Sequence, residues 1–464
     1  MTSTKIWIAH ALLALWISMR SSGQLWVWLK HWTQPSEYVE GYQIDTSDIE
    51  WKLYRNSLSG FLFAFILHSV LFQIIIRVFK RKDGDVILAI FWIFLQLYLT
   101  SINCILFTGI LILLATTITY FTRRQIFSWI ICIIFVLKAD LWAPYSYTPE
   151  KYYREFNFYL YTAVQVINFC IYLVKNPEKK FDFELMIRYA QYLFYPTYSI
   201  TLIMLYEDFE NQLNLVWKKV EKQETLWGPE VDFWFFVKKA IRLIFWFYFI
   251  ELFLHFIFVN ALFNSPFTLI SGLHPVSKYS QMWRYFDQGL YQFLKNQVYI
   301  PLMGNTKNEL ILNLRRLGAM VSVFLFVLAW HGLRSNYLYW VLLSALELCI
   351  ERFGRYITTT TTWTNFSKFI GEANTTRITA LSMLLTVIPG IFGVFFFLGP
   401  KGIGDTIFVN VLVDGVVDCF TLNVRYANSG FVFAHLLILG YCFNNVCIYL
   451  EKKYGFDTRK RKVE

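Results

Sequence analysis

The feature that most constrains this chain is a series of long stretches that carry no Asp, Glu, Lys or Arg. A transmembrane helix needs about 20 mostly apolar residues, and a helix satisfies its backbone hydrogen bonds internally within a bilayer. The sequence therefore predicts an all-α polytopic membrane protein. Stretches of this kind are Ser57–Ile76, Val86–Thr122, Phe156–Val174, Leu317–Leu333, Ile378–Pro400 and Tyr426–Leu450.

The pattern of apolar and polar residues predicts a bundle of about ten transmembrane helices with re-entrant or interfacial segments in addition. Val86–Thr122 is too long for one helix and is expected to break near Ser101–Asn103. Further spans are expected near 125–144, 185–206 and 236–262, and Glu207–Glu230 is expected to form an amphipathic surface helix. No internal repeat is visible, so we expect residues 1–464 to form a single integral-membrane domain.

Composition and charge agree with a membrane protein and argue against a nucleic-acid partner. Charged residues make up 16% of the chain, against about 25% in soluble proteins. The clearest clusters behind the net charge of +11 flank apolar stretches, as at Arg77–Lys82 and in the basic tail at 451–464. Because basic residues favour the cytoplasmic side of spans, we expect a cytoplasmic C-terminus.

The first apolar segment, Ile6–Met19, has two interpretations. It follows Lys5 and precedes the letters RSSGQ, as the apolar core of a secretory signal peptide would. No clear A-x-A cleavage site follows, however, and Leu25–Leu29 continues the apolar character. We therefore expect a retained first helix.

The seven cysteines indicate neither a disulfide scaffold nor a metal site. Six lie in apolar runs, Cys419 lies near one, and no CxxC pair occurs. A structural zinc site or a redox dithiol would normally show such pairs. We expect the cysteines to be small buried apolar residues, and we predict no metal site.

The segment WRYFDQGLYQFLKNQVYIPLMG, residues 283–304, is too polar to cross lipid alone. We expect it at the interface or in a protein-lined cavity, with Pro301 ending its helix. Arg284 and Asp287 are spaced i,i+3 and can meet on one face, so an anchoring ion pair is an alternative to a catalytic role for Asp287. The predicted apolar face consists of Leu290, Phe293, Leu294 and either Gln297 or Val298.

Five histidines lie in apolar segments, where ionisable groups are costly and often functional. His331 stands apart because it lies near the end of the Leu317–Leu333 stretch, in the run LFVLAWHGL, and Gly332 leaves space for a substrate beside it. A basic linker with Arg315 and Arg316 is expected before its helix. A satisfied structural role is expected for the other four histidines, which are His10, His68, His255 and His435.

Three short motifs together resemble the signature of the membrane-bound O-acyltransferase superfamily. They are WRYFD at 283–287, YIP at 299–301 and WHG at 330–332. More narrowly they resemble the Hedgehog acyltransferase branch, although the glycerol-uptake-type branch shares much of the pattern. The resemblance is densest at 280–355 and touches most of the chain.

The resemblance implies a bundle of tilted helices around a tunnel, with roles for five residues. His331 would be the general base and Asp287 its acidic partner, toward the opposite end of the tunnel. Trp283 and Arg284 would line the acyl-donor side, and Trp330 would contact substrate beside the histidine.

The implied reaction moves a long-chain acyl group, palmitoyl in this branch, from acyl-CoA to the N-terminal Cys amine of a secreted Hedgehog-like protein. The implied location is the endoplasmic reticulum membrane or the Golgi, with acyl-CoA, a lumenal protein acceptor and membrane lipid as partners. No cofactor is firmly expected. The haem-bearing cysteine of some family members has no counterpart between Cys170 and Cys349, and His274 is only a weak replacement.

Three other functions stay open at this point. A lipid O-acyltransferase of the same superfamily would use a glycerol- or glycosylphosphatidylinositol-type acceptor through a lateral gate. A transporter would show inverted repeats and paired broken helices, of which only Pro389–Gly390 is a candidate. An inactive regulatory paralogue would lack the histidine that this chain keeps.

Two N-x-S/T sites, at Asn365 and Asn374, are expected in the loop between the helix after His331 and the next span. Counting spans back from a cytoplasmic tail puts this loop in the cytoplasm. We therefore expect neither site to be glycosylated.

Overall fold

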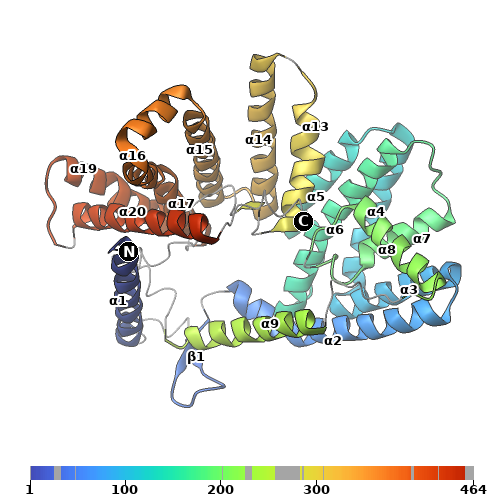
Figure 1. Cartoon of the computed structure of the whole chain (residues 1–464). Coiled ribbons are helices and arrows are strands. Elements are labelled where there is room, and N and C mark those ends of the chain that lie inside the picture. The colour runs from blue at the N-terminus through green and yellow to red at the C-terminus, as the bar shows by residue number, and fades with distance from the viewer. Residues whose placement is uncertain are drawn as a thin grey trace. The chain divides into compact units, whose positions relative to one another are not determined.

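The computed structural model describes residues 2–25, 33–46, 49–200, 202–224, 233–256, 283–284, 287–306, 308–398, 402–426 and 428–454 (Figure 1). Its contacts divide the chain into two compact units. Unit 1 comprises Met1–Asp48, Ile244–Phe286 and Leu333–Glu464, and unit 2 comprises Ile49–Leu243 and Asp287–Gly332.

Unit 2 is a helical bundle whose most deeply buried long helix is α6 (Pro149–Lys175), which contacts α2, α4, α5, α7 and α8. Helix α9 (Phe233–Phe253) contributes residues to both units. The other elements of unit 2 are α2 (Ile49–Val78), α3 (Arg81–Leu99), α4 (Ile102–Thr122), α5 (Ile126–Trp142), α7 (Phe183–Phe194), α8 (Tyr206–Glu221), α12 (Gln288–Phe293), the π-helical turn η3 (Leu294–Tyr299), α13 (Ile300–Met303) and α14 (Glu309–His331).

Unit 1 packs α15 (Ser335–Thr358) along α17 (Leu384–Leu398), and α20 (Ser429–Tyr454) contacts α1, α16, α17 and α19. A short antiparallel pair of strands, β1 and β2, places Thr33 opposite Asp45. The remaining elements are α1 (Thr2–Leu25), β1 (Thr33–Pro35), β2 (Gln43–Asp45), α16 (Thr361–Ser382), α18 (Ile403–Ile407), the π-helical turn η4 (Phe408–Val413) and α19 (Asp414–Phe420).

The predicted all-α polytopic membrane fold is confirmed. Among the described residues, six helical stretches are long and apolar enough to cross a membrane. The larger number of spans expected from the sequence stays a prediction. The six are Glu50–Val78, Ile102–Thr122, Pro149–Lys175, Glu309–His331, Thr361–Phe397 and Ser429–Lys453.

The predicted break inside Val86–Thr122 is confirmed. Helix α3 ends at Leu99, and the hydroxyl of Ser101 accepts a hydrogen bond from the Cys104 backbone N–H at 3.3 Å. A serine in this position satisfies one of the N–H groups that a helix start leaves open. Ser101 therefore begins the second helix, after α3 has ended at Leu99.

The span predicted near 185–206 is wrong. Helix α7 has only 12 residues, which makes it about 18 Å long and too short for a hydrocarbon core of about 30 Å. It ends at Phe194 because Pro196 disfavours helical geometry at Tyr195. No single helix therefore runs from α7 to α8, which begins at Tyr206.

The predicted amphipathic helix is present as α8, and residues 225–230 of that prediction lie outside the described part. Its apolar face is buried in unit 2 rather than turned to lipid, with Trp217 only 1% exposed. The residues of this face are Tyr206, Phe209, Leu213 and Trp217.

A buried polar network ties α3, α7 and α8 together around Asp85. Arg188 donates to both carboxylate oxygens, at 2.9 and 3.4 Å. The indole N–H of Trp217 donates to Oδ1 at 2.8 Å, and the Gln191 amide donates to the Asp85 carbonyl at 2.9 Å. A buried charge is tolerated when it is paired and hydrogen-bonded in this way.

Two placements of polar residues differ from expectation. Arg315 and Arg316 lie inside α14 rather than in a linker, because Asn308 begins that helix by accepting from the Ile311 N–H at 3.2 Å. Asn365 and Asn374 lie on the exposed surface of α16 rather than in a loop.

The expectation for the cysteines holds only in part. Cys349 is exposed on α15, and Cys419 and Cys447 are half-buried. The buried cysteines are Cys104, Cys132, Cys170 and Cys442.

Candidate functional site

The part of the polar segment 283–304 that begins at Asp287 forms one arm of a helical hairpin in unit 2. α12, η3 and α13 follow one another, and both η3 and α13 contact α14 (Figure 1). The Phe293 and Phe326 rings lie 5.4 Å apart across the hairpin. The predicted apolar face is confirmed as buried, through Leu290, Phe293, Leu294 and Val298.

Pro301 does not end this arm as expected. It lies in α13, which directly follows η3 and continues to Met303, so its missing backbone N–H removes one helical hydrogen bond without ending the helix. The chain leaves the helix at Gly304, whose φ of +53° is a conformation that other residues adopt rarely.

Asp287 begins the hairpin and has a structural role that the sequence reasoning missed. Its carboxylate accepts a hydrogen bond from the Leu290 backbone N–H at 2.8 Å, so it caps α12. An aspartate two or three residues ahead of an open N–H is a preferred helix cap. Tyr285 and Phe286 lie outside the described residues. The predicted ion pair with Arg284 stays a prediction.

His331 is the last residue of α14, and the chain turns away at Gly332 with φ +101° and ψ 148°. A Cβ at Gly332 would meet no atom within 4 Å, so the position is open, as expected. Backbone conformation rather than crowding requires glycine here. The helix end therefore presents a half-buried imidazole at a defined position.

Asp287 and His331 lie toward the same end of the hairpin, and the expectation of opposite ends is wrong. Asp287 is six residues before Phe293 and His331 is five residues after Phe326, and these two phenylalanines are in contact. In antiparallel arms both residues therefore lie roughly 7–9 Å beyond the contact in one direction. The sequence reasoning failed because it treated α14 as following the polar segment in line.

Tyr161 of α6 is a third residue at this end, and sequence reasoning missed it. Its ring lies 5.6 Å from the Trp330 ring at 84°, an edge-to-face contact. It also interacts electrostatically with Asp287. No local signal marks Tyr161, because one tyrosine among 29 in the chain carries no motif.

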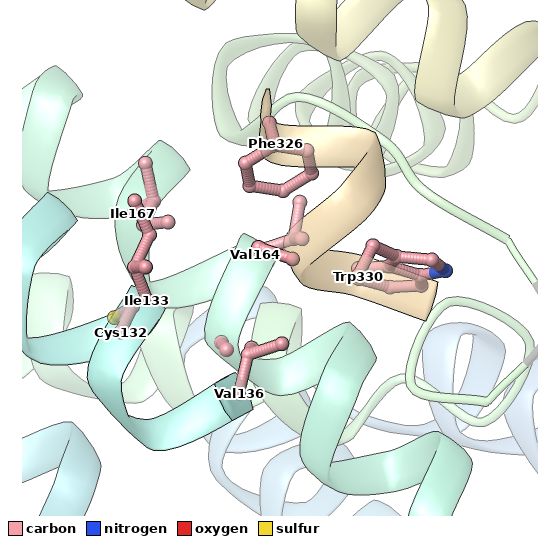
Figure 2. A pocket seen from close by; sticks show the side chains of 9 residues that line it. Cys132, Ile133, Val136, Val164, Ile167, Phe326 and Trp330 are labelled. Carbon is pink, nitrogen blue, oxygen red and sulfur yellow. The ribbon is translucent and has the colours of Figure 1, made fainter. Parts of the chain in front are cut away.

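A small apolar cavity lies against the last turns of α14 (Figure 2). Phe326, Ala329 and Trp330 line it from α14, and α5 and α6 supply the rest. It has room for about one water molecule, so it is a small apolar hollow and not a chamber for a whole substrate. The lining from α5 and α6 is Cys132, Ile133, Val136, Ala163, Val164 and Ile167.

Trp283 and Arg284 belong to unit 1. There the Trp283 ring lies 5.7 Å from that of Trp340, which in turn lies 4.3 Å from Phe397. Arg284 is exposed and Trp283 is half-buried. Their expected roles on the acyl-donor side stay predictions.

The four other histidines are satisfied by neighbours, as predicted. The ring of His68 accepts from the Trp92 indole at 2.9 Å, and His255 lies 2.6 Å from the Ser36 hydroxyl. His10 of α1 and His435 of α20 meet at 2.8 Å between their Nε2 atoms.

Within the described part of the chain, no group of three His, Cys, Asp or Glu residues could hold a metal ion. His274, the weak candidate for a haem ligand, lies outside the described residues. Neither a haem nor a metal enters the chemistry considered below.

Comparison with known proteins supports the resemblance that the motifs predicted. Residues 229–384, about a third of the chain, include Asp287 and His331 and match the model of the membrane-bound O-acyltransferase family. Over this part the chain is similar to that family, and it is also similar to the relatives below.

Two curated relatives are protein-cysteine N-palmitoyltransferases. The chain is 31% identical to Rasp of Drosophila melanogaster over 139 residues, which is 30% of this chain and 27% of that protein. It is 22% identical to HHAT of Mus musculus over 378 residues, which is 67% of this chain and 71% of that protein. The predicted resemblance to this branch is therefore confirmed.

A third relative has a different acceptor in its name. The chain is 33% identical to a peptidoglycan O-acetyltransferase of Helicobacter pylori over 90 residues, 19% of this chain and 15% of that protein. The alignments thus span from about a seventh to about seven-tenths of the relatives' own lengths.

Proposed function

We propose that this protein is a membrane acyltransferase that moves a long-chain fatty acyl group, palmitoyl in the first place, from acyl-CoA to the N-terminal Cys amine of a secreted Hedgehog-like protein. The observation that carries the proposal is the hairpin register. It brings His331 and Asp287 to one end, beside an apolar cavity. The similarity to two protein-cysteine N-palmitoyltransferases supports the choice of donor and acceptor.

In this proposal His331 acts as the general base. The amine nitrogen attacks the thioester carbonyl carbon, and the imidazole takes the proton that the nitrogen loses. The C–S bond then breaks, the amide remains on the acceptor, and the imidazolium returns the proton to the leaving CoA sulfur. An α-amine with a pKa of about 7.7–8.0 needs modest help, and such general-base assistance is worth about 10²–10⁴-fold.

The surroundings of His331 suit these steps. A nearby carboxylate favours the imidazolium that forms during the reaction, and Asp287 lies toward the same end of the hairpin. Apolar walls favour a fatty chain by about 0.8 kcal/mol for each buried CH₂ group. The cavity beside Trp330 has such walls, and it would have to widen to admit a chain. Exclusion of water also protects the thioester from hydrolysis.

The test is transfer of labelled palmitate from palmitoyl-CoA to a peptide with an N-terminal Cys, by the purified full chain in detergent. We expect the wild type to transfer palmitate to this peptide and to transfer none to a peptide with a blocked amine. The product should resist hydroxylamine because it is an amide. His331→Ala should lose at least about 10²-fold in kcat. Leu333→Ala, an exposed position two residues on, is the matched control.

Each other outcome has a definite meaning. Activity surviving in a folded His331→Ala variant would contradict the general-base role. Transfer to glycerol- or inositol-containing lipids with none to peptides would replace the protein acceptor by a lipid one. The proposal also places the chain in the endoplasmic reticulum or Golgi membrane, with its C-terminus in the cytoplasm where acyl-CoA is available.

A further inference from the structure

Unit 1 contains a buried acid that the proposed chemistry does not use. Glu347 lies in the middle of α15 and is 0% exposed, on a face that also buries Trp340, Val341 and Ser344. Neither of its carboxyl oxygens has a hydrogen-bond partner among the residues that the structure describes. Buried polar groups are almost always hydrogen-bonded, so an exception calls for an explanation.

The acid faces an interruption in the neighbouring helix. A Cβ built at Gly390 of α17 would lie 3.5 and 3.6 Å from the two Glu347 carboxyl oxygens. Pro389, the residue before it, lies inside α17 and has no N–H. The usual hydrogen bond from position 389 to the Leu385 carbonyl therefore cannot form, so α17 lacks one backbone hydrogen bond next to the residue that the acid faces.

Among the residues that the structure describes, no cation is bonded to Glu347. The charged group that acts on it is Glu351, one turn along the same helix, and Arg355 binds Glu351 at 3.1 Å. Helix α17 has no ionisable residue. On the elements packed nearby, His435 is bonded to His10, Lys452 to Glu372 and Arg377 to Asn374. Arg352, Lys368 and Asp405 are exposed.

These observations decide the charge of the group. An ionised carboxylate without a partner is very costly in a low-dielectric interior, and such a group takes up a proton instead. A protonated carboxyl has one O–H donor, whereas a carboxylate has only acceptors and would stay uncompensated beside Gly390.

We propose that Glu347 is a buried proton-binding site, and that the bound proton is required for α15 to pack against α17. When the proton leaves, the carboxylate must reach water or a cation, and the two helices must separate around Gly390. The ligand of the site is the proton itself. The proposal does not depend on acyl transfer.

The test is thermal unfolding of the purified full chain, followed by tryptophan fluorescence. A proton that only the folded state holds makes unfolding easier as pH rises, by up to about tenfold in the equilibrium constant for each pH unit. We expect the wild-type Tm to fall between about pH 5 and pH 9, and the Glu347→Gln variant to lose most of this fall. Asp405→Asn, which changes an exposed acid of the same unit, is the control and should keep the wild-type profile.

Two results would overturn the proposal. One is a Glu347→Gln profile that falls with pH as the wild type does. The other is strong destabilisation of Glu347→Gln at every pH, which would mean that the charged form is needed. If Gln does not fold, Glu347→Met, of similar size and without charge, replaces it, and failure of both variants to fold counts against the proposal.

Discussion

Single side chains in this molecule owe their roles to partners that are distant in sequence. His68, His255 and His435 are matched by Trp92, Ser36 and His10, and none of these pairs is visible as a motif. A burial-prone histidine predicts only that some partner exists. The motif residues His331 and Asp287 could be selected because their types and spacing recur in a family.

Tyr161 gives the residue-scale prediction for the site. Replacing it by Phe keeps the ring against Trp330 and removes only the hydroxyl near Asp287. The phenol then no longer acts electrostatically on the Asp287 carboxylate, so we expect kcat for palmitate transfer to fall severalfold with KM unchanged. Tyr153→Phe, on the same helix, is the control. Full activity of Tyr161→Phe would leave only the ring contact as its role.

The limits of sequence reasoning are clearest for Tyr161, Arg188 and Glu347. Each is defined by a neighbour on another helix, through Trp330, Asp85 and Gly390 respectively. Glu347 carried one signal, since it is an acidic residue inside the largely apolar run YWVLLSALELCI. An ionisable residue in an apolar segment of a membrane protein is a candidate functional residue, but the sequence does not show which helix it faces.

At the scale of elements, the sequence predicted the break between two helices better than it predicted which segments cross the membrane. The serine cap at the α3–α4 break was predictable from the length of the apolar stretch and its polar centre. The false span at 185–206 arose because hydropathy does not register that Pro196 ends a short helix. The hairpin of α12–α13 and α14 could not be predicted, because only side-chain contacts such as Phe293–Phe326 set its register.

Replacement of two glycines by alanine should change the stability of the protein in opposite directions. A Cβ at Gly289 of α12 would lie 2.3 Å from the Ile203 carbonyl oxygen, so backbone must move. Gly289→Ala should cost about 1–3 kcal/mol, as overpacking does, and lower both Tm and acyl transfer. Gly318 of α14 has nothing within 4 Å of such a Cβ, so Gly318→Ala should gain up to about 1 kcal/mol.

Thermal unfolding of the two variants beside the wild type checks this pair. Equal stability of Gly289→Ala and wild type would mean that the 195–205 segment yields easily to α12. A loss in Gly318→Ala would show that the exposed face of α14 contacts something that requires glycine.

At the scale of the whole molecule, the sequence predicted the class and the membrane setting, and the two-unit organisation emerged only from the structure. Segment Asp287–Gly332 belongs to unit 2, while the residues on either side of it belong to unit 1. The motifs WRYFD at 283–287 and WHG at 330–332 thus fall where the chain passes from one unit to the other. Contact partition of this kind depends on long-range packing and leaves no mark in hydropathy.

Topology gives the whole-molecule prediction. Asn365 and Asn374 are exposed on α16, so access would not prevent their modification on the lumenal side. With a cytoplasmic tail, both sites face the cytoplasm, and we expect no mobility shift on glycosidase treatment of the protein expressed in eukaryotic cells. A glycan at either asparagine would contradict the cytoplasmic placement of the C-terminus.

The π-helical turn η3 has a consequence for how this chain tolerates insertions and deletions. A π-turn amounts to one extra residue accommodated inside a helix, and here it lies between the cap at Asp287 and the turn at Gly304. Deleting one residue from Leu294–Tyr299 would therefore restore ordinary helical geometry without changing which face of the flanking turns points at α14. A one-residue deletion within α14 would instead rotate the turns beyond it by about 100°, so this chain should tolerate the loss of a residue at η3 and not on the opposite arm.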